Sequence, residues 1–105
     1  MLQGLLSLFK TPHELVVKNH QYFQGLDQEK DLGEYDFVVV DTELTGLNPR
    51  KDEIVSIGAV RIKGMHVDPN ETFYSLVKPQ GKMPKLSTLI HRITPEQVET
   101  APSLD

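Results

Sequence analysis

The chain has 105 residues, 38% of them hydrophobic, which is enough for the modest core of one small domain. Its formal charge of -4 argues against a protein that holds nucleic acid by bulk electrostatics, because phosphate neutralisation normally needs clustered Lys and Arg. The chain has no cysteine, which excludes disulfides and thiolate zinc sites and favours a reducing, cytoplasmic setting.

Residues 1–34 are predicted to form a helical N-terminal extension and linker. Apolar residues recur at helical spacing in residues 1–9, and Thr11-Pro12-His13-Glu14 has the pattern of a capping box with proline at the first helical position. A helix should therefore start near that proline and stop at Gly25, before the polar linker of residues 27–34. Residues 1–9 have no basic start and are much shorter than a membrane span, so we expect neither a signal peptide nor a transmembrane helix.

Three β-strands are predicted after this extension. Phe37-Val38-Val39-Val40 is a continuous apolar run, typical of a central strand covered on both faces and ending near residue 41. Residues 54–62 and 72–77 have the patterns of two further strands. Turn signals in Lys63-Gly64 and Asp68-Pro69-Asn70 separate them. Short connections between consecutive strands predict a three-stranded antiparallel meander.

The last part of the chain, after residue 81, loses the strand pattern. Thr94-Pro95-Glu96-Gln97 repeats the capping-box pattern, which predicts a short helix through Val98. Residues 35–105 are therefore interpreted as the N-terminal part of an α/β domain. Ala101-Pro102-Ser103 resembles the entry to another helix, so we expect the fold to be truncated.

Two carboxylates are the main candidates for chemistry. Asp41 and Glu43 lie two residues apart at the end of the apolar run, and strand geometry points both side chains to one side. Their repulsion and loss of solvation are costly unless a cation or a shared proton compensates, and a hard divalent metal would do so. The alternative is that both side chains simply face water at a strand end. A phosphatase-type nucleophile normally comes as D-x-D, so Glu43 counts against that chemistry.

The carboxylates belong to a longer pattern. The segment Asp41-Thr42-Glu43-Leu44-Thr45-Gly46-Leu47, followed by residues 52–60, resembles the first motif of the DEDD superfamily of 3′–5′ exonucleases. The likeness is to its DEDDh-like branch, which includes the proofreading epsilon subunit of DNA polymerase III and ribonuclease T. It continues through residues 73–79 and 90–98, so it covers about residues 35–105. Leu44 and Arg92 stand where the family usually has threonine and glycine, and neither departure removes a metal ligand.

The resemblance implies a ribonuclease-H-like fold in which Asp41 and Glu43 bind two catalytic divalent metal ions, Mg²⁺ or Mn²⁺. The family hydrolyses single-stranded DNA or RNA from its 3′ end and releases nucleoside 5′-monophosphates, and a DNA polymerase subunit is a candidate partner. The residues that the resemblance places near the substrate are Thr42, Thr45, Gly46, Leu47 and His91.

The later motifs of the family are absent from these residues: the second aspartate of a His-Asn-x-x-Phe-Asp segment, the general-base His or Tyr, and the last aspartate. With two of four acidic ligands, the chain should hold metal weakly and show negligible nuclease activity alone. The alternative is a non-catalytic, truncated exonuclease-like module for binding or assembly, which docks a partner helix on residues 2–26. An uncovered sheet also predicts self-association.

Overall fold

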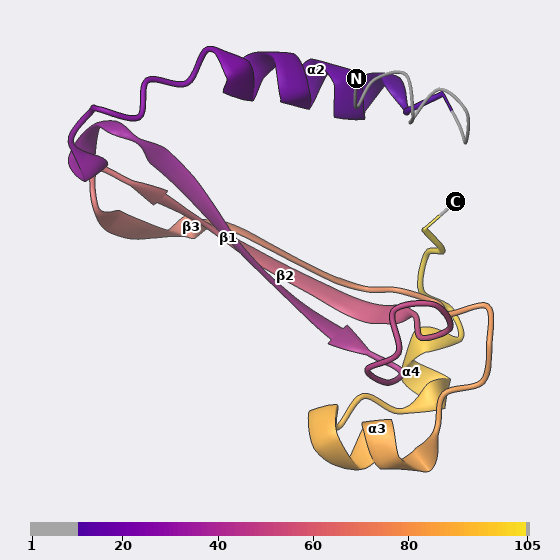
Figure 1. Cartoon of the computed structure of the whole chain (residues 1–105). Coiled ribbons are helices and arrows are strands. Elements are labelled where there is room, and N and C mark those ends of the chain that lie inside the picture. Colours follow the sequence, from indigo (N-terminus) through magenta and orange to yellow (C-terminus); the bar gives the residue numbers. More distant parts are fainter. Residues whose placement is uncertain (1–10, 105) are drawn as a thin grey trace. The chain divides into compact units, whose positions relative to one another are not determined.

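The structure is a computed structural model that describes residues 11–104 (Figure 1). The chain divides into two compact units, residues 1–30 and residues 31–105. The predicted division into an extension over residues 1–34 and a domain over residues 35–105 stays a prediction. The helical pattern of residues 1–9 lies outside the described residues.

In the first unit, helix α2 spans Glu14–Gln24. It starts later than predicted and uses another cap, because the Nδ1 atom of His13 accepts a hydrogen bond from the Leu15 amide at 3.1 Å. The acceptor expected from the Thr11 hydroxyl is thus supplied two residues further on. The predicted stop is confirmed, since Gly25 is the C-cap. No helix within residues 11–104 combines the length and the apolar character that crossing a membrane requires.

The second unit begins with the 3₁₀ helix η1, Leu32–Glu34, and is built on an antiparallel sheet of three strands. The strands are β1, Asp36–Leu44, β2, Ile54–Lys63, and β3, His66–Leu76 (Figure 1). Their order in the sheet, β1-β2-β3, confirms the predicted meander. The tight turn predicted at Lys63-Gly64 is also confirmed: Gly64 and Met65 have φ values of 55° and 63°, the left-handed pair that closes a two-residue hairpin.

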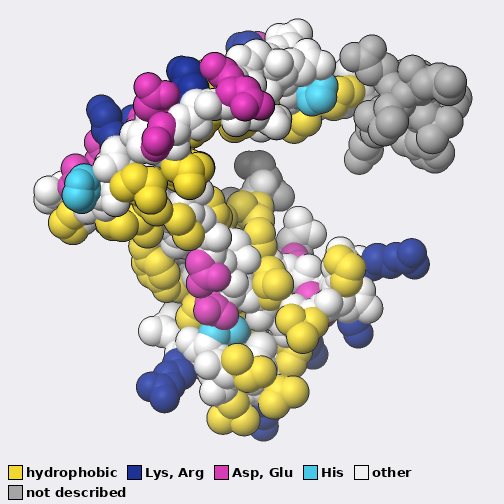
Figure 2. Space-filling model, turned by 60° about the vertical axis from the view of Figure 1, so that its left-hand side comes forward, with side chains coloured by type: hydrophobic (Ala, Val, Ile, Leu, Met, Phe, Trp, Pro, Cys, Tyr) yellow, Lys and Arg dark blue, Asp and Glu magenta, His cyan; other side chains and the backbone are white. Residues whose placement is uncertain are grey.

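Strand β1 lies at an edge of the described sheet, and β2 lies in the middle. The prediction of a central, doubly covered strand is therefore wrong for the described residues. Val38, Val39 and Val40 are 63%, 50% and 59% exposed. A run with apolar side chains on both faces needs cover on both, and the described helices of the same unit do not supply it. Figure 2 shows how widely hydrophobic side chains lie at the surface.

Strand β3 starts earlier than predicted. Asp68-Pro69-Asn70 was expected to separate strands, but it lies inside β3, so that prediction is wrong. Its turn chemistry is nevertheless present, because Asp68 Oδ1 accepts a hydrogen bond from the Asn70 amide at 2.9 Å. The register passes from Val67 opposite Ile62 to Thr72 opposite Val60. The extra residues are therefore accommodated as a bulge within the strand.

Two short helices follow the sheet: α3, Lys85–His91, and α4, Pro95–Val98. The capping box predicted for α4 is confirmed, because Thr94 and Gln97 exchange side-chain and backbone hydrogen bonds. Helix α3 was not predicted. Its apolar side chains Leu86, Leu89 and Ile90 recur at helical spacing and are 68%, 77% and 73% exposed, but seven residues are too few for this spacing to identify a helix by itself.

The core of the second unit is small. Its buried hydrophobic residues, among those described, are Val55, Val77, Ile93 and Val98. Val55 is completely buried and packs with Ile93 and Val98, so the start of β2 is joined to α4 and to the segment that leads into it. This packed end of the sheet is also the end at which β1 stops, and it fixes the backbone around the candidate site.

Candidate metal and nucleotide site

Asp41 and Glu43 lie within β1, which continues to Leu44 and so runs beyond the predicted end near residue 41. The register pairs Asp41 with Gly58 and Glu43 with Ser56 on β2. Residues directly opposite in an antiparallel pair share a face, so each carboxylate has a small neighbour beside it. Small residues on β2 therefore lie next to both carboxylates.

Neither carboxylate forms a hydrogen bond or an ion pair with another described residue. Asp41 is exposed and Glu43 is partly buried. Within residues 11–104, no group of three or more His, Cys, Asp or Glu side chains is placed to hold a metal ion. Two carboxylates without protein partners fit a divalent cation as part of its oxygen coordination, and further ligands must complete the shell.

A cavity of about 620 Å³ lies beside Glu43. The predicted site residues that line it are Thr42, Glu43, Thr45, Gly46, Leu47 and His91. Asp41 is the one predicted site residue that does not. The opposite wall is formed by the start and inner side of α3, including Pro84, Ser87 and Ile90. The structure thus brings the motif after β1 and the distant His91 to one cavity.

The loop after β1 is closed by a side chain from its far end. The Thr45 hydroxyl donates a hydrogen bond to Asp52 Oδ1 at 3.1 Å and accepts one from the Glu53 amide at 2.9 Å. The Asn48 amide donates to Asp52 Oδ2 at 2.8 Å. A Cβ on Gly46 would lie 2.5–2.8 Å from the atoms of the Asp52 carboxylate, so only glycine fits there.

Asp52 belongs to the motif that the sequence showed, but the sequence pattern predicted no role for it. The structure shows that this one carboxylate binds a hydroxyl and an amide of the Thr45–Asn48 turn and lies against Gly46. The sequence did contain a signal: the backbone amides of the short Thr-Gly turn need acceptors, and an acidic residue stands at the end of that turn. The spacing alone could not show which side chain supplied them.

His91 is the last residue of α3 and one of the residues that line the cavity. Its Nδ1 accepts a hydrogen bond from the Ile93 amide at 3.1 Å. Because an accepting Nδ1 carries no proton, the neutral ring is protonated at Nε2. Nε2 is buried and has no hydrogen-bond partner. The structure therefore holds a donor without a protein acceptor at the wall of the cavity.

Arg92 is the C-cap of α3 and has φ 63° and ψ 11°, in the left-handed region. Its amide donates a hydrogen bond to the Thr88 carbonyl at 2.8 Å, which closes the helix. Glycine is the residue that adopts this conformation at least cost. The departure from the family pattern at Arg92 therefore falls at a position where a side chain strains the backbone.

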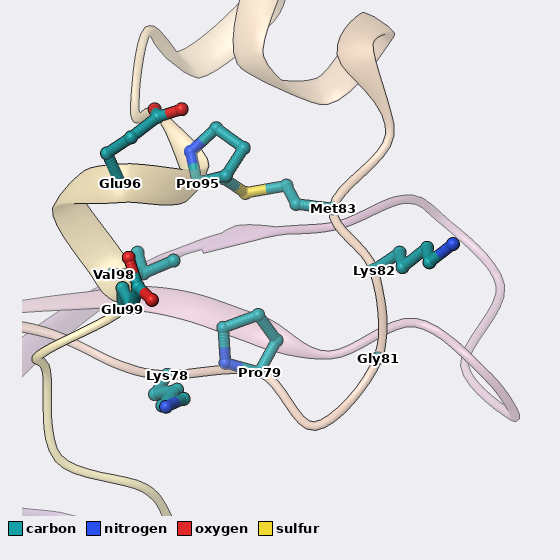
Figure 3. A pocket seen from close by; sticks show the side chains of 9 residues that line it. All are labelled: Lys78, Pro79, Gly81, Lys82, Met83, Pro95, Glu96, Val98 and Glu99. Atoms are coloured by element: carbon teal, nitrogen blue, oxygen red, sulfur yellow. The ribbon is translucent and has the colours of Figure 1, made fainter.

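A second cavity, of about 480 Å³, lies between the loop after β3 and α4. Figure 3 shows its lining, with the Met83 side chain extending toward Pro95, Lys78 and Lys82 on the loop, and acidic residues on and just after the helix. None of the predicted site residues lines it. The cavity beside Glu43 is therefore the one that brings the predicted residues together.

Arg61 links the three strands at the end of the sheet where β1 starts. It donates hydrogen bonds to Asp36 on β1 and, at 2.9 Å, to Glu71 on β3. The hydrogen bond from Arg61 holds the pKa of the Asp36 carboxyl below its usual value, and the two carboxylates raise the pKa of Arg61. This exposed network fixes strand register away from the cavity.

Residues 38–105 match a protein family described as Exonuclease. The chain is 33% identical over 102 residues to the PolC-type DNA polymerase III of Thermotoga maritima, covering 97% of this chain and 7% of that protein. It is 47% identical over 77 residues to a DNA polymerase III subunit epsilon-like protein of Rhodobacter capsulatus, covering 72% of this chain and 11% of that protein. The chain thus spans about a tenth or less of the length of these relatives.

Solved structures share the fold. A full-length 3′-exonuclease superposes with a TM-score of 0.57 at 21% identity, over 98% of this chain and 40% of that one. Exonuclease I of E. coli, solved with a dT13 oligonucleotide, gives a TM-score of 0.56 at 24% identity, over 64% of this chain and 15% of that one. At these identities the likeness shows the fold alone, and it confirms the predicted α/β, ribonuclease-H-like arrangement of meander and helices.

Proposed function

The chain belongs to the exonuclease family, and from that premise we propose that it carries the first metal-binding carboxylates of a 3′–5′ exonuclease. The substrate is single-stranded DNA or RNA, and the product is a nucleoside 5′-monophosphate. The observation that carries the proposal is the end of β1, where Asp41 and Glu43 have no hydrogen-bond or ion-pair partner among residues 11–104 and Glu43 lines a cavity together with the Thr45–Leu47 turn and His91.

Asp41 and Glu43 would hold the divalent ions, Mg²⁺ or Mn²⁺, at the end of β1. When bound, two such ions lower the pKa of an attacking water and stabilise the leaving 3′ oxygen. The small neighbours Gly58 and Ser56 leave the carboxylate oxygens accessible to ions and to a phosphate. Because no donor or cationic side chain within residues 11–104 bonds to these oxygens, binding a cation breaks no contact among those residues.

The cavity beside Glu43 would take the 3′-terminal nucleotide. Leu47 is 94% exposed, and Leu86 and Ile90 lie on the opposite wall, so apolar surface is available for a base. Packing of a base against aliphatic side chains reads no base edge, so it tolerates any sequence, as an exonuclease requires. His91 supplies the complementary polar contact, because its Nε2–H lacks an acceptor within the described protein. A nucleotide oxygen or ring nitrogen would satisfy it.

The chain by itself should hydrolyse nucleic acid negligibly. Two carboxylates give magnesium few protein ligands, and magnesium keeps its waters unless several carboxylates or phosphates assist. No described residue stands out as a general base for the attacking water. The relatives are much longer DNA polymerase III proteins, and a DNA polymerase subunit in the cytoplasm is the partner we propose for the whole protein.

A second candidate is a non-catalytic module that acts by association. The observation in its favour is β1, whose Val38–Val40 run is exposed on both faces at the edge of the described sheet. Unpaired strand edges and exposed apolar faces promote pairing with another chain. We expect self-association in sedimentation, and a Val39→Lys variant should weaken it. A strictly monomeric profile at all protein concentrations would contradict this candidate.

The test of the main proposal is metal-dependent release of mononucleotides from a 3′-labelled single strand. Three proteins are compared: the 105-residue chain, a longer chain that continues past Asp105, and that longer chain with Asp41→Ala. Activity in the longer chain alone, lost with Asp41→Ala, supports the exonuclease role. A longer chain that folds and is inert with both Mg²⁺ and Mn²⁺ would favour the association module instead.

A further inference from the structure

We propose that the adjacent carboxylates of Asp52 and Glu53 are positioning residues that hold the two opposite walls of the cavity beside Glu43. Asp52 holds the loop after β1, and Glu53 holds the loop that leads into α3. We call this pair the double clamp. The inference rests on the proposed function, because only there does the cavity receive a nucleotide.

The first arm of the clamp is Asp52. Its two carboxylate oxygens accept hydrogen bonds from the Thr45 hydroxyl and the Asn48 amide, at 3.1 and 2.8 Å. A backbone hydrogen bond closes the same turn, since the Asp52 amide donates to the Asn48 carbonyl at 2.9 Å. Leu47 lies inside the turn closed by these contacts. Its 94% exposed side chain is therefore carried on a fixed backbone at the rim of the cavity.

The second arm is Glu53. Its Oε1 accepts a hydrogen bond from the Gln80 amide at 2.8 Å, and its Oε2 accepts one from the Gly81 amide at 2.7 Å. Two amides on one carboxylate fix both the position and the orientation of this loop. The loop continues through Pro84, the N-cap of α3, directly into the helix that forms the second wall.

Packing alone holds α3 weakly. Its apolar residues are largely exposed, and Ser87 is the one buried residue of the helix. Just before the helix in sequence, Met83 packs partly against the core, and just after the helix, Ile93 is buried in the core. The position of the helix therefore depends on its two connections to the rest of the unit. The Glu53 carboxylate binds the first of them at two points.

Adjacency explains how two neighbouring residues can serve two loops. Asp52 bonds to the loop after β1 and Glu53 to the loop after β3, so the two side chains reach in different directions from the residues just before β2. The Glu53 backbone pairs with Thr45, because the Thr45 amide donates to the Glu53 carbonyl at 2.9 Å. Two residues later, Val55 is fully buried. The backbone that carries both side chains is thus fixed by its pairing with Thr45 and by the buried Val55.

The experiment uses the 105-residue chain with Asp52→Asn or Glu53→Gln. Glu34→Gln is the control, since Glu34 has the same charge and its side chain makes no hydrogen bond or ion pair with another residue in the range 11–104. Glu53→Gln places a side-chain donor against one of two amide donors. Asp52→Asn places a side-chain donor against the Thr45 hydroxyl, which then loses its acceptor, and replaces the carboxylate acceptor of the Asn48 amide by a neutral one. NMR titration with dTMP in the presence of Mg²⁺ measures nucleotide affinity, and titration with Mg²⁺ alone measures metal affinity. Amide exchange at Asn48, Gln80 and Gly81 reports which arm has opened.

Each clamp variant should weaken dTMP binding about 10-fold and leave Mg²⁺ binding unchanged. Asp52→Asn should lower protection of the Asn48 amide alone, and Glu53→Gln that of the Gln80 and Gly81 amides alone. Lost protection with unchanged dTMP affinity would overturn the double clamp while the proposed function stands. If the unchanged chain shows no dTMP binding at all, the cavity is not a nucleotide site in this chain and the double clamp is overturned, whereas the exonuclease role is decided by the activity of the longer chain.

Discussion

The two ends of strand β1 differ in how well the described residues pack around them. Around Asp36–Val40 the strand is an exposed edge, held by Arg61 and by pairing with β2. Around Glu43 the strand lies next to three ordered features: the buried core around Val55, the turn closed by Asp52, and the cavity. The end that carries the candidate chemistry is thus built by short-range contacts, and the other end leaves apolar surface uncovered.

The difference shows that hydrophobic sequence and burial are separate properties. The Val38–Val40 run is the most apolar part of β1 and is exposed, whereas the more polar neighbourhood of the Thr45–Asn48 turn is tightly bonded. Order at the candidate site comes from charged hydrogen bonds to backbone amides, which contribute more than neutral ones. Substitutions at the two ends should therefore have unequal effects.

The largest difference should appear between matched valines. Val55→Ala should lower the free energy of unfolding by about 2 kcal/mol, because it removes two buried methyl groups and leaves a cavity in a small core. Val39→Ala, at a 50% exposed position, should change it by less than about 0.5 kcal/mol. Urea unfolding followed by circular dichroism measures both. Equal losses would show that the two ends of the sheet are equally packed.

Gly46→Ala should disrupt the turn closed by Asp52. The new Cβ would displace a carboxylate that binds Thr45 and Asn48, so we expect a loss of about 2 kcal/mol in unfolding free energy. Gly33→Ala is the control, because its added Cβ would meet its nearest atom at 3.6 Å, an ordinary contact. A Gly46→Ala protein as stable as the Gly33→Ala protein would mean that the Asp52 carboxylate is not fixed.

Arg92→Gly should stabilise the fold by about 1 kcal/mol, since it relieves a side chain in the left-handed conformation at the end of α3. Arg50→Gly is the matched control. Arg50 is not among the residues with positive φ, so glycine there should bring no gain and some loss through the entropy of the unfolded chain. A stability gain at both positions would point to charge, and not backbone strain, as its cause.

The smallest effect concerns pH at the opposite end of β1. The pKa of Asp36 is lowered from the usual value of 3.8, mainly by the hydrogen bond from Arg61. A depressed carboxyl pKa stabilises the fold above the unfolded value and loses that contribution as pH falls through the folded value. NMR titration of the Asp36 carboxyl should show its pKa return upward in Arg61→Gln. An unchanged pKa in that variant would exclude Arg61 as the cause.

Local patterns predicted much of the second unit. The meander follows from strand patterns with short connections, and the capping box at Thr94 follows from side-chain chemistry within four residues. The Asp68-Pro69-Asn70 segment did produce turn chemistry, but cross-strand pairing continued around it as a bulge. Neighbouring strands decide whether a turn signal ends a strand, and a single segment does not contain that information.

The candidate site was predictable where the signal was a motif and unpredictable where it depended on distant contacts. Asp41 and Glu43 share a face because strand geometry requires it, and the cavity joins the Thr45–Leu47 turn to His91 as the resemblance implied. Helix α3 was missed because its seven residues are too few for the helical spacing of Leu86, Leu89 and Ile90 to be decisive. Glu53 binds amides at Gln80 and Gly81, well beyond the reach of a local pattern. The roles of the site residues remain predictions.

The central claim is that Asp41 and Glu43 together hold divalent cations beside the cavity. Paramagnetic broadening by Mn²⁺ in NMR spectra of the 105-residue chain tests it most directly, with the Asp41→Asn, Glu43→Gln double variant as the control. The account predicts selective broadening at Thr42, Glu43 and the facing Gly58, weak binding, and loss of both in the double variant. Broadening that is absent, or that persists in the double variant, would contradict it.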